Sequence, residues 1–257
     1  MIHPTAIIHE NAQVHTGAEI GPYSIIDEYV TVGADCKVGP HAHITGHTTI
    51  GKSNHFHAGC VIGDNPQDVK YNNQPTRLVI GDRNTFREHV TIHRSNTLDE
   101  DTVIGSENIF MASSHVGHNS IVGNKVILAN GALVGGHAMI GDGAFLSGNA
   151  VVHQFCRVGS MAMMQGCAGV SLDLPPFTIV RGINGMCGLN SIGLKRAGFA
   201  AEERMELKKA YRAIFLSENL LKESLDKARA EFTGVLAGQL IDFVAASERG
   251  ICSHVRR

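Results

Sequence analysis

The chain carries an aliphatic or similar apolar residue at every sixth position over most of its first two thirds. One run of eleven such positions extends from Ile2 to Ile62, and the pattern resumes at Ile80 and continues from Ile104 to Val170. A period of six fits neither the 3.6-residue period of an α-helix nor the simple alternation of a strand. It is typical of short strands joined by corners, three to a coil. We therefore predict a mainly β fold, a left-handed parallel β-helix of hexapeptide repeats.

Two further regularities define the expected coil. The residue four positions after each apolar residue is usually small, and glycine often follows the apolar residue directly. We expect the apolar side chains to point into a thin prism, the small ones to fill its corners, and glycine to allow unusual backbone angles there. The cysteines at small positions are then core residues: Cys36, Cys60 and Cys156.

The pattern also divides the chain. Residues 64–79 and 95–103 are polar and rich in turn formers, which predicts loops extruded from the coil. Prolines at 175 and 176 should end the rod, so we expect a β-helix over residues 1–177 and a helical domain over 178–257. Helical spacing predicts three helices over 200–215, 217–232 and 235–250, with Ser217 as an N-cap.

Charge and hydrophobicity exclude several classes of protein. There are 22 basic and 24 acidic residues, which argues against bulk electrostatic binding of nucleic acid. No apolar run is long enough to span a membrane, and the first residues do not resemble a secretory signal, so we expect a cytoplasmic protein with free thiols. The helical part holds 13 basic and 9 acidic residues against 9 and 15 in the rod, which indicates either an acidic partner at that end or a solvated helical surface.

Histidines gather in adjacent columns of the expected coil. Residues 18 apart should stack about 4.8 Å apart, which places His118 beneath Gly136 and brings His137 and His153 into the neighbouring columns, with His115 one strand away. One imidazole could act as general base toward a sugar hydroxyl while glycine amides bind an oxyanion. Three imidazoles could instead bind zinc. The residues leave both chemistries open, and with no P-loop or dinucleotide fingerprint we expect no cofactor.

Seven segments carry a closer resemblance, which covers essentially the whole chain. They are residues 65–71, 80–84, 90–94, 115–118, 135–137, 152–156 and 193–199. In this order they resemble the UDP-N-acetylglucosamine O-acyltransferase family, which opens lipid A biosynthesis in the cytoplasm. The resemblance implies transfer of an (R)-3-hydroxyacyl group from acyl carrier protein to the 3-hydroxyl of UDP-N-acetylglucosamine, by a metal-free homotrimer with sites between its rods.

The resemblance also implies residue roles. His118 matches the general base and the backbone N–H of Gly136 the oxyanion donor, while Gly166 matches a position that limits acyl length. The remaining matched positions contact the sugar, the acyl chain or the nucleotide: Gln67, Asp68, Lys70, His93, His115, His137, His153, Gln154, Asn190 and Arg196.

Three positions depart from the family pattern. Asn119 stands where an aspartate often follows the base, Ile192 where an acidic nucleotide contact occurs, and Ala197 where a second basic residue follows Arg196. An asparagine can orient an imidazole but cannot stabilise its positive charge. N-acylation of a 3-amino-3-deoxy UDP-sugar therefore stays an alternative, beside a zinc-dependent hydratase and a non-catalytic module on the same fold.

Overall fold

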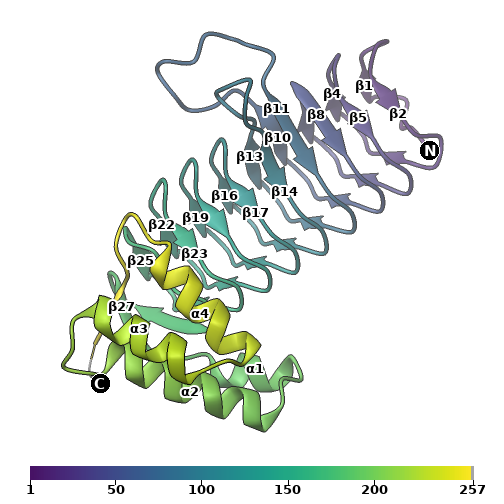
Figure 1. Ribbon diagram of the computed structural model, residues 1–257. Helices are drawn as coiled ribbons and strands as arrows, with labels where there is room; N and C mark the ends of the chain where they lie inside the picture. The colour runs from purple at the N-terminus through teal and green to yellow at the C-terminus, as the bar shows by residue number, and fades with distance from the viewer. Residues whose placement is uncertain (256–257) are drawn as a thin grey trace.

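The computed structural model describes residues 1–255 as a three-sided rod with helices at its C-terminal end (Figure 1). From β1 (Ile7–Ile8) to β25 (Gly169–Val170) consecutive short strands belong in turn to three sheets, and each pairs in parallel with the strand one coil away, whereas β26 (Thr178–Arg181) and β27 (Gly185–Leu189) pair antiparallel at the end of the rod. The register confirms the 18-residue coil, because Ile7 pairs with Ile25, and His115 with Leu133. The predicted stacking of residues 18 apart is therefore correct.

The strands are distributed over the sheets as follows. The first sheet contains β1 (Ile7–Ile8), β4 (Ile25–Ile26), β7 (His43–Ile44), β10 (Val61–Asp64), β13 (Thr91–His93), β16 (His115–Val116), β19 (Leu133–Val134), β22 (Val151–Val152) and β25 (Gly169–Val170). The second contains β2 (Gln13–Val14), β5 (Thr31–Val32), β8 (His47–Ile50), β11 (Arg77–Ile80), β14 (Thr102–Ile104), β17 (Ile121–Val122), β20 (Met139–Ile140) and β23 (Arg157–Val158). The third contains β3 (Glu19–Ile20), β6 (Lys37–Val38), β9 (His55–Phe56), β12 (Thr85–Phe86), β15 (Ile109–Phe110), β18 (Ile127–Leu128), β21 (Phe145–Leu146), β24 (Met163–Met164), β26 (Thr178–Arg181), β27 (Gly185–Leu189) and β28 (Ser253–His254).

The core is a narrow column filled by the sixth-position side chains. Nearly all of them are fully buried, and each such aliphatic contributes about 1.5–3 kcal/mol through burial. Phe56, Phe86 and Phe110 stack along the axis with ring centroids 4.7 and 4.9 Å apart. Cys36 and Cys60 are buried in the corners as expected, and burial raises the pKa of the Cys60 thiol to about 12.

The prediction that glycine directly after the apolar residue allows unusual backbone angles is wrong. The left-handed residue of a corner is the third after the apolar residue and is mostly not glycine, as at Tyr23, where φ is +57°. Glycine directly after the apolar residue serves close approach instead: a Cβ at Gly33 would lie 2.4 Å from the carbonyl oxygen of Gly51 on the next coil. Glycine therefore allows adjacent coils to come together.

The two extruded loops are shorter than expected. Asp64 ends β10, and Arg77–Ile80 pairs with β8, so the first loop spans residues 65–76 rather than 64–79. The second spans 94–101 rather than 95–103, because β14 begins at Thr102 and continues the second sheet. In both cases strand pairing recruits the last residues of a segment that resembled a loop in the sequence.

Up to residue 255 four helices follow the rod: α1 (Ser191–Arg196), α2 (Ala201–Phe215), α3 (Leu221–Glu231) and α4 (Val235–Ala245). The short α1 was not predicted, and Ser217 is not an N-cap, because α3 begins four residues later and the Ser217 hydroxyl bonds to that of Ser224. No helix within residues 1–255 has the length and apolar character needed to cross a membrane.

The rod and the helices are joined through Arg157, which is half-buried and pairs with the buried Asp173. Arg157 on β23 pairs with Asp173 at 2.8 Å, donates to the carbonyl oxygen of Phe243 on α4 and lies over that ring. The third sheet itself continues through β26, which pairs with β24. The sheet thus extends past the boundary expected at residue 177, and the two parts share one continuous structure.

Candidate functional site

One edge of the prism brings most of the candidate residues together. Both extruded loops leave the coil between a strand of the first sheet and the next strand of the second sheet, after β10 and after β13. The corners after β16, β19 and β22, on successive coils, lie on the same edge. This edge therefore carries Asp68, His118, Gly136, His137 and Gln154, and coil stacking fixes their order.

His118 and Asn119 form a hydrogen-bonded pair at the corner after β16. Asn119 has φ +59° and is 6% exposed, and its side-chain oxygen lies 2.8 Å from Nδ1 of His118. That oxygen also accepts the N–H of Asn96, while the amide nitrogen donates to the hydroxyl of Ser95 at 2.8 Å. These partners fix the orientation of the amide, so Nδ1 of His118 carries the hydrogen and Nε2 keeps a free lone pair.

Gly136 lies directly against the imidazole of His118, as the 18-residue spacing predicts. A Cβ built on Gly136 would be 2.9 Å from His118 Nε2, and a Cβ on Gly117 would be 2.7 Å from the Gly136 nitrogen. The N–H of Gly136 has no hydrogen-bond acceptor among residues 1–255. An imidazole nitrogen and a backbone N–H without an acceptor among residues 1–255 therefore lie on adjacent coils at one edge, which suits acyl transfer through an oxyanion.

A cavity of about 340 Å³ opens beside the pair. Its lining is Gln67, Asp68, Val69, Asn96, His118, His137, Gln154 and Phe155. His137 meets His118 edge to face at 5.2 Å and stacks on Phe155 at 4.7 Å. Burial, followed by the charge of His118, lowers the pKa of His137.

The first loop reaches the cavity through Asp68. Its carboxylate accepts the backbone N–H of Lys70 at 2.9 Å and the side-chain amide of Asn96 at 2.7 Å. These bonds lower the pKa of Asp68, so its side chain is anionic at neutral pH. The side chain of Lys70 is exposed. Arg94 holds this loop to the rod, because it donates to the carbonyl oxygen of Gly63 on β10 and also to the hydroxyl of Tyr71 and the side-chain oxygen of Asn65 on the loop.

His93 and His115 form a second, drier pair. Their rings meet edge to face at 5.1 Å, and His115 Nδ1 lies 2.8 Å from the hydroxyl of Thr91. Burial, with the neighbouring charges of His93 and His118, lowers the pKa of His115 to about 4. Both imidazoles are therefore neutral around pH 7, and neither lines the cavity. His153 is exposed at the rim, with Nδ1 3.1 Å from the carbonyl oxygen of Gln154.

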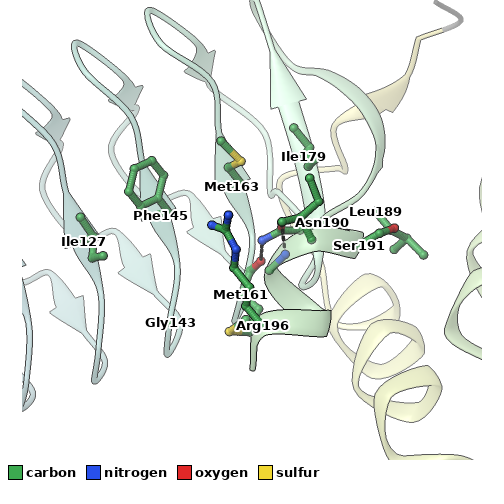
Figure 2. A pocket seen from close by; sticks show the side chains of 12 residues that line it. Ile127, Gly143, Phe145, Met161, Met163, Ile179, Leu189, Asn190, Ser191 and Arg196 are labelled. Carbon is green, nitrogen blue, oxygen red and sulfur yellow. Dashed lines mark hydrogen bonds between the residues drawn. The ribbon is translucent and has the colours of Figure 1, made fainter. Parts of the chain in front are cut away.

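Asn190 and Arg196 do not join this cavity within one chain. They line a separate, largely apolar pocket of about 640 Å³ beside the third sheet (Figure 2). Asn190 caps α1, accepting the N–H of Gly193, and donates to the carbonyl oxygen of Met161. Arg196 extends from α1 over the sheet, near Phe145 in the close-up.

The outward corner between β24 and β25 holds Gly166. A Cβ there would meet only the carbonyl oxygen of Gly148, at 3.7 Å, so the space around it is open. Ile192 lines the α1 pocket and is 68% exposed, and Ala197 directly follows α1.

Several site residues were missed from the sequence. Ser95 and Asn96 hold the amide of Asn119, Glu100 lies 3.3 Å from that amide, and Phe155 supports His137. The sequence indicated only that the second loop is polar. Because the loop lacks the period of six, its residues have no predictable position relative to the coils, so the sequence could not show which of them contact Asn119. Within the described part of the chain, no three His, Cys, Asp or Glu side chains are arranged to hold a metal ion.

Comparisons with known proteins agree with this geometry. Residues 29–64 match the family described as bacterial transferase hexapeptide (six repeats), and residues 173–252 match the second domain of UDP-N-acetylglucosamine O-acyltransferase. Acyl-[acyl-carrier-protein]–UDP-N-acetylglucosamine O-acyltransferases from Myxococcus xanthus and Anaeromyxobacter dehalogenans are 46% and 44% identical, each over 97% of this chain and 98% of the relative.

The fold comparison extends over the same length. The crystal structure of UDP-N-acetylglucosamine acyltransferase from Francisella novicida superposes with a TM-score of 0.94 at 36% identity, covering 98% of this chain and 94% of that one. The predicted fold class, a left-handed parallel β-helix with a C-terminal helical domain, is confirmed.

Proposed function

The chain belongs to the UDP-N-acetylglucosamine O-acyltransferase family, and from this we propose that it moves an (R)-3-hydroxyacyl group from acyl carrier protein to the 3-hydroxyl of UDP-N-acetylglucosamine, the first step of lipid A biosynthesis. The observation that carries the proposal is the contact of His118 with Gly136. The proposal is supported by an oriented imidazole that lines a cavity of about 340 Å³, and by an N–H on the adjacent coil that has no acceptor among residues 1–255.

In this reaction His118 acts as the general base. Its Nε2 takes the proton of the sugar 3-hydroxyl as that oxygen attacks the thioester carbonyl carbon, and Asn119 holds the ring through Nδ1. The tetrahedral intermediate places its negative oxygen on the N–H of Gly136. The carbon–sulfur bond then breaks, and the departing thiolate takes the proton from the imidazolium. General base catalysis of this kind contributes about 10²–10⁴ in rate.

The cavity residues bind the substrates. Asp68, held anionic by its hydrogen bonds, accepts from sugar hydroxyls, with Gln67 and Lys70 on the same loop and Gln154 opposite. His137 shapes the floor beside the base. His93 and His115 act as neutral neighbours, and His153 contacts substrate at the rim. Open space at Gly166 admits a long acyl chain.

The separation of Asn190 and Arg196 from the cavity supports a homotrimer. The outward positions of the third sheet form an apolar ribbon beside α1: Ile109, Ile127, Phe145, Met163 and Ile179. Packing this ribbon against a neighbouring rod removes apolar surface from water. The same packing brings the pocket lined by Asn190 and Arg196 next to the His118 cavity of the neighbouring subunit. There the guanidinium of Arg196 is suited to bind the diphosphate of the UDP-sugar.

A second acceptor fits the same machinery. The amide of Asn119 is neutral, so the base lacks the adjacent carboxylate that would stabilise its protonated form. An amine nucleophile depends less on such a base, which favours a 3-amino-3-deoxy UDP-sugar as the alternative acceptor. The free thiols of all six cysteines and a nucleotide-sugar substrate both support a cytoplasmic location.

The test uses purified protein with acyl carrier proteins of several chain lengths and both UDP-sugars, with products identified by mass. We expect His118→Ala to lose transfer by at least a hundredfold while the oligomer stays intact. His41→Ala is the matched control, since His41 sits at a corner (φ +55°) stacked on Tyr23 and should keep full activity. Near-normal turnover by His118→Ala would remove the basis of the proposal. A stoichiometric metal whose chelation stops activity would point to the hydratase.

A further inference from the structure

Glu100, on the second extruded loop, contacts both side chains that flank the base. Its Oε2 lies 3.3 Å from the amide nitrogen of Asn119 and 3.7 Å from Nδ1 of His137. Neither the hexapeptide pattern nor the family resemblance singled out this residue. Its carboxylate is thus one hydrogen-bonded group away from the Nδ1 of His118.

The proposed reaction places a positive charge where the chain has only a neutral partner. When His118 accepts a proton, its Nδ1–H points at the amide oxygen of Asn119. An amide can accept this bond but carries no charge to offset the imidazolium. A carboxylate bonded to the other end of the same amide polarises it, which strengthens the bond to Nδ1.

We propose that Glu100 is a positioning residue that supplies this missing charge through the chain His118–Asn119–Glu100. The proposal rests on the acyltransferase function given above. Glu100 touches no reacting atom; it acts through the Asn119 amide. Its side chain is 64% exposed, so water screens it and the effect is modest.

Other charged groups also face His118 and must stay constant in the test. They are Asp68 and Lys70 on the first loop, His93 on β13, His115 on β16 and His137 at the corner after β19. Asp68 is tied to Asn96 rather than to Asn119. Unlike these groups, Glu100 is hydrogen-bonded to the Asn119 amide that orients the base.

The main experiment is a double-mutant cycle between positions 100 and 119. We expect Glu100→Gln to lower kcat about three- to tenfold and to move the acidic limb of the kcat/KM profile about half a pH unit lower, because the protonated base loses a stabilising charge. In Asn119→Asp the new carboxylate contacts His118 directly and faces Glu100 at close range. There Glu100→Gln should be neutral or favourable, since it removes like-charge repulsion. Asp99→Asn, a carboxylate-to-amide change on the same loop, is the matched control and should leave kcat unchanged.

Two kinetic outcomes overturn the proposal: an unchanged pH profile in Glu100→Gln, or an equal loss from that change in both backgrounds. The equal loss would show a role independent of the amide. An NMR titration of the His118 ring in wild type and Glu100→Gln needs no turnover, so it separates failure of this inference from failure of the proposed function. An unchanged ring titration midpoint also contradicts the proposal.

Discussion

Replacing Gly136 by alanine tests the contact on which the proposed mechanism depends. The new Cβ would lie 2.9 Å from His118 Nε2 and 3.0 Å from Cε1, whereas ordinary contact begins near 3.4 Å. The imidazole must therefore move by about half an ångström. Misplacing a catalytic group by about 1 Å costs roughly a hundredfold, so we expect a ten- to hundredfold loss of kcat, about 1.4–2.7 kcal/mol of transition-state free energy.

The variant separates position from hydrogen bonding, because alanine keeps its backbone N–H. Steady-state kinetics should show a fall in kcat with little change in KM for the acyl donor, and thermal unfolding should stay close to that of the wild type. Gly148→Ala is the matched control, since a Cβ at that corner has its nearest neighbour, the carbonyl oxygen of Asn130, at 3.6 Å. If Gly136→Ala keeps the turnover of Gly148→Ala, the base does not work from the position that the structure gives it.

Two predictions concern stability. Asp173→Ala should lower the free energy of unfolding by about 3 kcal/mol in urea titrations, because the buried carboxylate binds Arg157 and Ser247 and its removal leaves the guanidinium of Arg157 unpaired. Glu107→Ala breaks an exposed ion pair and should change the free energy of unfolding by less than about 1 kcal/mol. Similar losses in the two variants would contradict this reasoning. Burial lowers the pKa of His115 to about 4, whereas its value in the unfolded chain is about 6.5. Between these two pH values the unfolded chain binds a proton that the folded chain does not, so the free energy of unfolding decreases as the pH is lowered. Between pH 7 and pH 5 the wild type should lose about 2 kcal/mol more than His115→Asn, and equal losses would show that this imidazole does not titrate as a buried group.

The sequence alone predicts those parts of the protein that follow from counting. Strict spacing of six places His118 under Gly136 without further information, because a residue on a coil without an extruded loop has a fixed neighbour 18 positions away. The same arithmetic fails in the loops, where no period fixes the register. The hydrogen bond between Asp68 and Asn96 joins two such segments and could not be foreseen.

Local signals were weaker than the repeat. Ser217 is a good N-cap type, but α3 begins after Leu220 because the helix forms where its apolar face can pack. Glycine after the apolar residue indicated special backbone angles, although its role is to leave room for the next coil. The presence of glycine alone does not show whether a position requires an unusual backbone angle or space for the adjacent coil. The resemblance supplied roles for Asn190 and Arg196, but only the structure shows that one chain leaves them away from the base.

The prism edge between the first and second sheets has a consequence for how such an enzyme can change. Its loops leave and re-enter the coil at the same corner, so their length can vary while the strands above and below keep their partners. A loop can therefore gain or lose polar side chains without any cost in core packing. New acceptors become accessible through insertions and substitutions at these exits, while the backbone of His118 stays where the stacked coils hold it.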